Sequence, residues 1–390
     1  QHTFKRRGYL LVRILFVTGS RGEWGYIRPI LRLIEKDPEL EYELCVTNMH
    51  LLPNFGSSEE EIKNDGFEIK HRVFMSLDSY NHISQVKSLG IFLTSMADIL
   101  ASNDYDFIML AGDRGEQLMG AIAGAYTYIP VGHIQAGEVS GNIDGAARHA
   151  IGKLAHVHFA SNVDAEERLI KLAEEKFRVF NTGAPQVDEM VKTSLLDPDY
   201  FEKKYNFDIT KEFFLVVQHP VTEEYDEAEN QINTTFNVLA KYEQKKVIIL
   251  PNNDAGSIAI QNVIKQRKTL EHVVFANLSR IEYLTLMRHS SLIIGNSSSG
   301  LLEAPTYNIP AVNIGRRQDG RVSGLNVIHT DFCETKIKKA IKKALSNDFK
   351  RMLEKDGFNP YGDGNSSENI LKIVKEIHDM KDLTIKKLTY

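Results

Sequence analysis

A polar, glycine-rich run, HIQAGEVSGNID, extends from His133 to Asp144 in the first half of the chain. It follows an apolar stretch typical of a buried strand, and it places Glu138 and Asp144 in one loop, with Arg148 shortly after them. Carboxylates held in fixed positions can remove and return protons during a reaction. A solvated surface loop is the alternative, but the density of polar residues between glycines favours a reaction site.

Two further candidates for proton transfer stand directly after apolar runs. Asp113 lies in the sequence AGDR, where it could instead serve only as the N-cap of a following helix. His219 follows the run LVVQ in the second half of the chain, and an imidazole there can transfer protons near neutral pH. A lone histidine can equally be structural, so the catalytic hypothesis rests on its position at the end of a predicted strand.

A serine-rich turn predicts where an anionic group binds. The sequence GNSSSG, with Ser297 and Ser298 inside it, separates an apolar run from a predicted helix that carries Glu303. Hydroxyls and backbone N–H groups at a helix start suit a diphosphate, and Glu303 is placed to accept hydrogen bonds from ribose hydroxyls. Asn252 and Asp254, in the sequence PNNDAGS after another apolar run, offer further hydrogen-bonding groups.

The first apolar run is followed by the sequence GSRGEWG, which contains Arg21 and Glu23. Its glycine spacing differs from the GxGxxG pattern of dinucleotide sites, so a nicotinamide cofactor is not expected. Arg21 and Glu23 are expected to contact the ligand, although a tight turn with solvated charges is the alternative. Arg321, in the cationic sequence GRRQDGR, is expected to neutralise phosphate unless it is ordinary solvated surface. His50 and Arg148 complete the set of predicted binding residues.

The composition limits the classes of partner. Lys and Arg total 47 against 52 Asp and Glu, and the isoelectric point is about 6.3, so no general attraction to nucleic acid or anionic lipid is expected. No run approaches the roughly 20 apolar residues of a membrane span. The 13 histidines show no HExxH spacing, so neither a metal nor another cofactor is expected. The 2 cysteines form no disulfide framework, which fits the cytoplasm.

Short runs rich in Val, Ile and Leu alternate with amphipathic stretches, which is typical of βα units on parallel sheets. The expected strands are 12–18, 42–47, 67–74, 107–111, 131–134, 156–160 and 178–181, followed by 214–218, 247–250, 273–276, 291–294 and 311–313. In the first half, helices are expected over 26–36, 83–102, 116–126, 147–154 and 165–174.

The alternation restarts after a Gly-Ala-Pro break at 183–185, which predicts two doubly wound α/β domains. The first domain, 12–190, carries the candidate proton-transfer carboxylates, and the second, 205–365, carries the turn expected to bind a diphosphate. A last helix within 366–382 is expected to pack back on the first domain. Ligands of such sheets bind beyond the carboxyl ends of the strands, so a cleft between the two sheets is expected.

Several of these sequences together resemble the motifs of one enzyme family. GDRGEQ, HIQAGEVSGNIDGAARHAIGKLAH, QHPVT, PNNDAGS, GNSSSG, GRRQDGR and YGDGNSSENIL are similar, in order, to the motifs of the hydrolysing UDP-N-acetylglucosamine 2-epimerases, from about residue 13 to about residue 377. That family includes the bacterial enzymes of sialic and legionaminic acid synthesis and the epimerase half of the animal bifunctional enzyme. The resemblance implies the GT-B fold, with two Rossmann-like domains and a nucleotide sugar as substrate. It also implies elimination of the nucleoside diphosphate to a 2-acetamidoglucal, followed by addition of water with inversion at carbon 2.

The resemblance also implies roles for individual residues. The family's catalytic positions fall on Asp113, Glu138, Asp144 and His219, and its nucleotide-sugar contacts fall on Arg21, Asn252, Asp254, Ser297, Ser298 and Glu303. It leaves open which carboxylate is the base and whether the nucleotide is UDP or GDP. It further implies a homodimer or homotetramer without a cofactor.

The chain departs from the common family pattern at a few positions. Gln135 stands where a glutamate is usual, and Gly145 stands where an acidic residue is frequent. We therefore expect Glu138 and Asp113 to be the proton-transfer groups. Trp24 stands where tyrosine is common, and its apolar surface would suit a deoxy sugar. A UDP- or GDP-linked 2,4-diacetamido-2,4,6-trideoxyglucose is thus the alternative to UDP-N-acetylglucosamine.

Other functions stay open on the sequence alone. A non-hydrolysing epimerase would return the nucleotide to the sugar, and a GT-B glycosyltransferase would share the fold but need an acceptor site. A non-catalytic nucleotide-sugar sensor would keep the binding residues without the chemistry. The filled catalytic positions favour an enzyme, and by resemblance the GEVSG run favours the hydrolysing branch.

Overall fold

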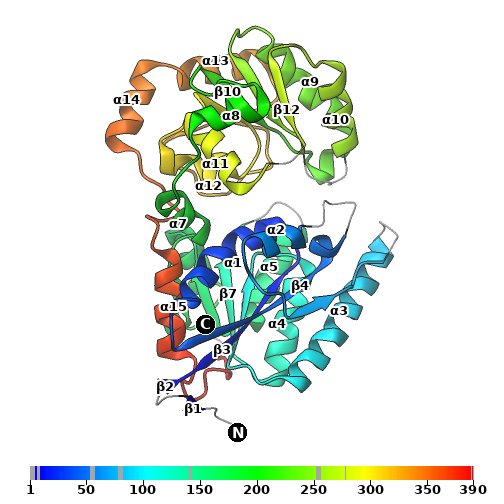
Figure 1. Cartoon of the computed structure of the whole chain (residues 1–390), viewed down its shortest axis with the longest axis vertical. Coiled ribbons are helices and arrows are strands. Elements are labelled where there is room, and N and C mark those ends of the chain that lie inside the picture. Colours follow the sequence, from blue (N-terminus) through cyan, green and yellow to red (C-terminus); the bar gives the residue numbers. More distant parts are fainter. Residues whose placement is uncertain are drawn as a thin grey trace. The chain divides into compact units, whose positions relative to one another are not determined.

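The chain forms two compact units, each with its own parallel sheet (Figure 1). The computed structural model describes residues 5–6, 9–52, 58–77, 82–139, 143–251, 256–276, 278–387 and 389. Unit 1 comprises Gln1–Val139, Ile143–Glu189 and Tyr361–Tyr390, and unit 2 comprises Ser140–Asn142 and Met190–Pro360. A search of the described residues for a helix long and apolar enough to cross a membrane finds none.

Unit 1 is built on a 7-stranded parallel sheet in the order β5-β4-β3-β6-β7-β8-β9. Its strands are β3 (Val12–Thr18), β4 (Leu40–Thr47), β5 (His71–Val73), β6 (Phe107–Ala111), β7 (Val131–Ala136), β8 (Val157–Ala160) and β9 (Val179–Asn181). A short antiparallel pair, β1 (Lys5–Arg6) and β2 (Tyr9–Leu10), precedes them. The strand order reverses between β3 and β6, and ligands of doubly wound sheets bind beyond the strand ends at such a switch point.

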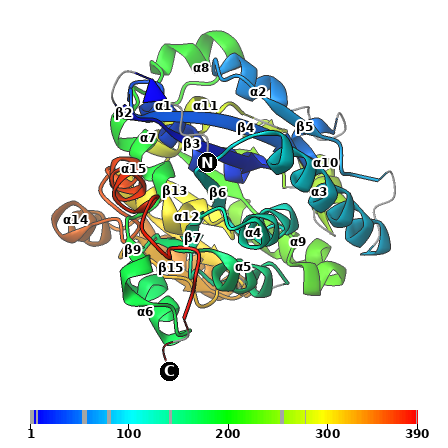
Figure 2. The same ribbon diagram turned by 90° about the horizontal axis from the view of Figure 1, so that it is seen from below.

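Helices cover both faces of this sheet. They are α1 (Arg21–Ile34), α2 (Glu59–Asn64), α3 (His82–Ser102), α4 (Gly115–Thr127), α5 (Ile143–Leu154), α6 (Val163–Lys171), α7 (Pro185–Lys192) and α15 (Ser366–Ile377). Helices α3, α4 and α5 lie side by side on one face, whereas α1 and α15 pack together on the other (Figure 2). The period of a strand explains this, because Ile14 and Phe16 of β3 join the core under α1 and Leu15 and Val17 join the core under α3.

Unit 2 carries a 6-stranded parallel sheet in the order β12-β11-β10-β13-β14-β15. Its strands are β10 (Phe213–Val217), β11 (Lys245–Ile249), β12 (His272–Phe275), β13 (Leu292–Gly295), β14 (Ala311–Ile314) and β15 (Val327–Thr330). Its helices are α8 (Pro198–Tyr205), α9 (Ala228–Leu239), α10 (Ser257–Gln266), α11 (Arg280–His289), α12 (Ser299–Leu302), α13 (Glu334–Ala344) and α14 (Asn347–Asp356). The two faces of the sheet contribute to two separate apolar cores, one of which includes residues of α9 and α13. The predicted fold class, two doubly wound α/β domains, is confirmed.

The elements differ from the expected ones where the apolar pattern is weak. Helix α1 begins at Arg21 and not at 26, because Ser20 and Glu23 form a capping box that starts it early. Helix α2 and strand β15 were not expected. Only Ile62 is buried in α2, and no residue of β15 is fully buried, so neither element shows a clear apolar period.

Trp24 does not offer the apolar surface that the sequence led us to expect. Its side chain is 1% exposed and packs edge-on against Phe67, with ring centroids 5.1 Å apart. Its indole Nε1 donates to Asp65 Oδ2 at 3.1 Å. The prediction that Trp24 contacts a deoxy sugar is therefore wrong, because an amphipathic α1 turns this side chain into the core.

After residue 360 the chain returns to unit 1. The two carboxylate oxygens of Asp188 accept hydrogen bonds from the backbone N–H groups of Ser366 and Ser367, at 3.0 and 2.6 Å, and so satisfy the start of α15. Ile370 and Val374 of α15 are fully buried in the core that α1 shares.

A buried charge network anchors the chain after α15. Lys386 Nζ donates to the carbonyls of Gly152 and Ala155, at 2.8 and 2.7 Å, and lies 2.6 Å from Glu174 Oε2. Although burial opposes it, the hydrogen bond from His158 and the charge of Lys386 lower the pKa of Glu174 to about 2. The carboxylate is therefore ionised and paired inside unit 1.

Lys386→Met is expected to lower the free energy of unfolding by about 1.5–3 kcal/mol, the usual range for hydrogen bonds to a charged group. The substitution removes the ammonium group that donates to the carbonyls of Gly152 and Ala155 and that partly neutralises the charge of Glu174. Lys387→Met, at an exposed neighbouring position, is the matched control. Urea unfolding measures both, and equal losses in the two variants would show that the ammonium of Lys386 does not anchor this segment.

Candidate active site

Asp113 stands just beyond the carboxyl end of β6, whose side chains are all buried. Its Oδ2 atom accepts a hydrogen bond from the guanidinium of Arg148 on α5. Arg148 is 3% exposed and also donates to the carbonyl of Gln135, at 2.8 Å, next to the end of β7. One buried arginine thus orients the carboxylate of Asp113 and joins the ends of two neighbouring strands.

Glu138 lies beyond the end of β7, the strand next to β6. It is 5% exposed, and its Oε1 atom accepts from Ser161 Oγ and Asn162 Nδ2, both at 2.5 Å. The backbone before it is irregular, because Gln135 has φ +59° and the register between β7 and β8 shifts at this point. Such bulges redirect side chains and are frequent next to active sites.

His133 supports this loop from inside the sheet. Its Nε2 atom lies 2.6 Å from the carbonyl oxygen of Gly112, to which it donates, so the proton is on Nε2. Burial lowers the pKa of His133 to about 3, so the ring is neutral. The side chain therefore fixes the backbone directly before Asp113 without adding a charge.

Three predicted residues cannot be placed atom by atom. Asp144 belongs to the first turn of α5, but its side chain lies outside the described part of the structure. Asn252 and Asp254 also lie outside the described residues. Their predicted roles stay predictions.

Glu23 acts as a capping residue for α1. Its Oε2 atom accepts from the backbone N–H groups of Gly19 and Ser20, at 2.5 and 3.1 Å, and the side chain is 3% exposed. Burial, and next the charge of Glu116, raise the pKa of Glu23 well above its usual range. We therefore assign Glu23 a structural role, which differs from the expected ligand contact. Arg21, in contrast, begins α1 with a partly exposed side chain 3.7 Å from Glu61.

His50 is also structural in its surroundings. It is fully buried, with Nε2 at 2.9 Å from Thr18 Oγ1 and Nδ1 at 2.7 Å from Ser58 Oγ. Burial lowers its pKa to about 4, so the ring is neutral at pH 7. His50 therefore links the end of β3 to the segment 58–64. This structural role differs from the ligand contact that we expected from the sequence.

In unit 2, an amide clamp holds the backbone of His219. Asn296 Oδ1 accepts from the His219 N–H at 2.7 Å, and Asn296 Nδ2 donates to the His219 carbonyl at 2.8 Å. The two residues follow β10 and β13, which are neighbours in the sheet. Gly295, the last residue of β13, has φ +137°, and a Cβ there would lie 2.1 Å from the carbonyl oxygen of Val217. Only glycine therefore allows this close approach of the two strand ends.

The serine turn follows directly. Ser297 Oγ lies 3.0 Å from Ser299 Oγ, which in turn lies 2.6 Å from the hydroxyl of Tyr283. Helix α12 has only 4 residues, so its dipole is small, and the diphosphate prediction rests on hydroxyls and backbone N–H groups.

The sequence predicted that Glu303 lies inside a helix, but in the structure it is the C-cap residue of α12. Pro305 explains the early end, because proline has no N–H for the carbonyl four residues before it. Glu303 Oε1 pairs with Arg280 at 2.8 Å.

The loop after β14 braces the same region. Arg317 and Gln318 donate to the carbonyl of Asn296, at 3.3 and 2.8 Å, and Arg321 donates to Gln318 Oε1 at 3.3 Å. The predicted cationic sequence is thus tied to the residue that holds His219. Among the described residues, no group of three or more His, Cys, Asp or Glu side chains has the arrangement of a metal site.

Sequence reasoning missed the residues that hold the site together. Ser161 and Asn162 donate to Glu138, His133 fixes Gly112, and Asn296 clamps His219. Their signal was their place directly after β8 and β13 or inside β7, where a polar residue in an apolar element must have a partner.

The two units together have the fold of two-domain GT-B-type enzymes. A UDP-GlcNAc 2-epimerase from Neisseria meningitidis, solved with UDP-GlcNAc bound, superposes with a TM-score of 0.81 at 20% identity, over 94% of this chain and 100% of that chain. This similarity confirms the predicted GT-B fold.

The chain belongs to the UDP-N-acetylglucosamine 2-epimerase family, whose model matches residues 32–375. The UDP-N,N'-diacetylbacillosamine 2-epimerase (hydrolyzing) of Legionella pneumophila is 34% identical, over 94% of this chain and 97% of that protein. The polysialic acid biosynthesis protein P7 of Escherichia coli is 32% identical, over 95% of each chain. The predicted family and enzyme class, a hydrolysing nucleotide-sugar 2-epimerase, are confirmed.

Glu23→Gln is expected to change how stability depends on pH. A raised pKa means that the folded state holds the proton more tightly, so this contribution is complete below the ordinary value of 4.5 and is lost as the pH rises through the folded-state pKa. Glutamine keeps an acceptor for the N–H groups of Gly19 and Ser20 but cannot ionise. The free energy of unfolding of the variant should therefore rise relative to the native protein as the pH rises above 4.5.

Urea unfolding over that pH range measures the effect, with Glu354→Gln on the exposed surface of α14 as the control. The same pH trend in both variants, or no trend in Glu23→Gln, would contradict the buried, proton-holding carboxyl.

Replacing both Ser297 and Ser298 with alanine is expected to weaken UDP binding by roughly 10²–10⁴-fold, the loss of two hydrogen bonds to a charged group at about 1.5–3 kcal/mol each. Calorimetric titration with UDP measures the dissociation constant, and circular dichroism checks the fold. Ser194→Ala, exposed elsewhere in unit 2, is the control. An unchanged dissociation constant in the double variant would show that Ser297 and Ser298 do not bind the diphosphate.

Proposed function

We propose that the protein eliminates UDP from a UDP-linked 2-acetamido sugar and then adds water to release the free sugar inverted at carbon 2. In the first step the proton leaves carbon 2, the bond between carbon 1 and the diphosphate oxygen breaks, and a 2-acetamidoglucal forms. In the second step water supplies hydroxyl to carbon 1 and a proton to the other face of carbon 2. The observation that carries this proposal is the placement of two oriented carboxylates, the half-buried Asp113 and the buried Glu138, beyond neighbouring strands.

The chemistry explains why such carboxylates are needed. No carbonyl group lies next to carbon 2, so its proton can leave only as the diphosphate departs, through a state with oxocarbenium character. A base fixed before the reaction and a firm hold on the leaving group both lower that barrier. In this proposal Ser297 and Ser298 of unit 2 hold the diphosphate, with Arg21, Asn252, Asp254, Glu303 and Arg321 as further contacts to the nucleotide sugar.

Glu138 is the better candidate for the base. Among the described residues its donors are Ser161 and Asn162, which are neutral and both meet at Oε1, and we assign the uptake of the proton to Oε2. Asp113 instead accepts from the guanidinium of Arg148, so this carboxylate is already held in an ion pair. We assign Asp113 to the proton transfer that follows elimination.

His219 and Asp144 complete the proposed machinery. We place the imidazole of His219 at the departing diphosphate, because Asn296 holds its backbone beside the serine turn. Asp144 is assigned to the sugar, through its place in the run that also contains Glu138.

A second candidate substrate differs only in the sugar. The relative from Legionella pneumophila, named for UDP-N,N'-diacetylbacillosamine, is 34% identical, whereas the UDP-N-acetylglucosamine 2-epimerase of Neisseria meningitidis is 31% identical. This difference favours a UDP-linked 2,4-diacetamido-2,4,6-trideoxy sugar, as in legionaminic acid synthesis. Turnover of both UDP sugars and of the GDP-linked form, compared by kcat/KM, decides between them.

We also propose that the enzyme works in the cytoplasm as a homodimer or homotetramer. Its free cysteines, Cys45 and Cys333, are compatible with a reducing compartment.

Turnover in heavy water is expected to place one deuterium at carbon 2 of a free sugar, because the proton that is added to carbon 2 in the second step comes from the solvent. Mass spectrometry and proton NMR of the product measure it. A product still linked to UDP would indicate a non-hydrolysing epimerase. A free product with only protium at carbon 2 would rule out the elimination.

Two variants separate the roles of the carboxylates. Glu138→Gln and Asp113→Asn should each reduce turnover by roughly 10²–10⁴-fold, the usual range for a general acid or base. Glu138→Gln should stop UDP release, whereas Asp113→Asn should still release UDP and let the glucal accumulate. Asp348→Asn, 90% exposed on α14, is the control. The reverse pattern would exchange the two assignments.

A further inference from the structure

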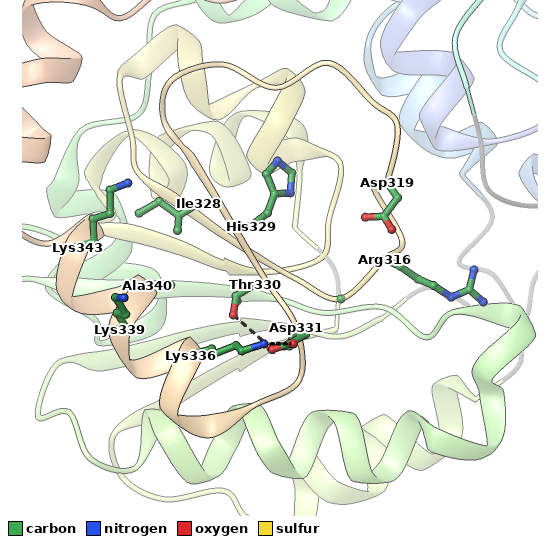
Figure 3. A pocket seen from close by; sticks show the side chains of 11 residues that line it. Arg316, Asp319, Ile328, His329, Thr330, Asp331, Lys336, Lys339, Ala340 and Lys343 are labelled. Carbon is green, nitrogen blue, oxygen red and sulfur yellow. Dashed lines mark hydrogen bonds and ion pairs between the residues drawn. The ribbon is translucent and has the colours of Figure 1, made fainter.

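Unit 2 contains a cavity that none of the predicted site residues lines. It lies between α13, the edge strand β15 and the loop after β14, and its volume is about 610 Å³ (Figure 3). Small-molecule sites usually measure about 300–1,000 Å³, so it is large enough for a ligand.

Helix α13 gives the cavity a positive wall. Lys336, Lys339 and Lys343 are spaced three and four residues apart, so they share one face of the helix, and all three line the cavity. Lys336 is paired with Asp331 at 2.7 Å. Lys339 and Lys343 make no ion pair with any described residue, so two positive charges on this wall are uncompensated within that part of the chain.

The other walls carry one further carboxylate, that of Asp319 in the loop that also holds Arg316, and are otherwise neutral or apolar. Ile328 and Ala340 contribute apolar surface, and His329 is hydrogen-bonded to Asn313 and Ser323, each at 3.2 Å. The charge of Arg316 is compensated by Glu224 outside the cavity. A compact anionic group next to Lys339 and Lys343, with an apolar body towards Ile328, would match these walls.

The cavity shares a wall with the predicted diphosphate region. Residues 315–319 form that wall, and within them Gln318 donates to the carbonyl of Asn296 at 2.8 Å. Asn296 in turn clamps the backbone of His219. A ligand that moved 315–319 would therefore act on the residue that positions both His219 and the serine turn.

We propose that this cavity is a second binding site, for a small molecule with a phosphate group, and that its occupation changes the affinity for UDP through the 315–319 loop and Asn296. The site itself stands on the cavity and its two uncompensated lysines. The coupling rests on the proposed function, because it requires UDP to bind at Ser297 and Ser298. Linkage makes the coupling reciprocal, so UDP must change phosphate affinity by the same factor.

Calorimetric titration with inorganic phosphate at constant ionic strength tests the site. The titration uses the Ser297→Ala/Ser298→Ala background, in which binding at the serine turn is weakened. Replacing Lys339 and Lys343 with alanine should weaken phosphate binding by roughly 2- to 30-fold, the loss of two exposed charge pairs. The control replaces Lys338 and Lys342, which are exposed on the same helix but do not line the cavity. Equal phosphate affinity in the two lysine variants, or no saturable binding in the background, would overturn the site.

UDP titration with and without phosphate tests the coupling in the chain with native serines. Phosphate should change the UDP dissociation constant differently in the native protein and in Lys339→Ala/Lys343→Ala, whereas the Lys338/Lys342 variant should behave like the native protein. The same change in all three would show simple competition at the serine turn and would overturn the coupling. Failure of UDP to bind at all would contradict the proposed function, and the phosphate titration would still decide on the site.

Discussion

The ion pair between Arg148 and Asp113 is the interaction on which the first unit's site depends. Arg148 is almost fully buried, and a buried charge without a partner costs several kcal/mol, about 3–5 when one member of a pair is removed. The arginine comes from α5, the carboxylate follows β6, and the carbonyl of Gln135 lies near the end of β7, so three elements must meet at one point. The bulge at Gln135 and the hydrogen bond from His133 to Gly112 then adapt the strand ends to that meeting point.

The second unit solves a similar problem with neutral groups. Asn296 bonds both backbone groups of His219, and the loop after β14 bonds the carbonyl of Asn296 through Gln318. The amide groups of Asn296 and Gln318 carry no charge, so they hold the peptide without the desolvation penalty of an ion, and the one charged donor to Asn296, Arg317, is only half-buried. The difference fits the chemistry that we propose. Unit 1 must keep carboxylates ready for proton transfer, whereas unit 2 needs donors fixed in place for an anionic leaving group.

The apolar pattern was enough to predict most of the fold, because most strands of the two sheets are short buried runs. Strands β3 and β6 begin and end where the sequence places them. The pattern failed where burial is partial, as in β15, or where one residue decides, as Pro305 does for α12.

The sequence was sufficient to select the acidic residues of the candidate site, but not to predict their contacts. Position after a strand pointed to Asp113 and Glu138, but the same rule also selected Glu23 and His50, which the structure buries as a helix cap and as a bridge between Thr18 and Ser58. Nothing in a single sequence separates a polar residue that faces a ligand from one that satisfies backbone groups. The burial of both kinds is set by side chains far along the chain, such as Asn162 for Glu138.

A reaction that passes through a 2-acetamidoglucal can be tested by supplying that compound to the enzyme. Synthetic 2-acetamidoglucal is given to the enzyme with UDP in heavy water, and the products are followed by NMR. We expect hydration to the free sugar inverted at carbon 2, with one deuterium at that carbon, at a rate no lower than overall turnover. Glucal that remains unchanged, while the same preparation turns over its UDP sugar, would rule out the glucal as an intermediate.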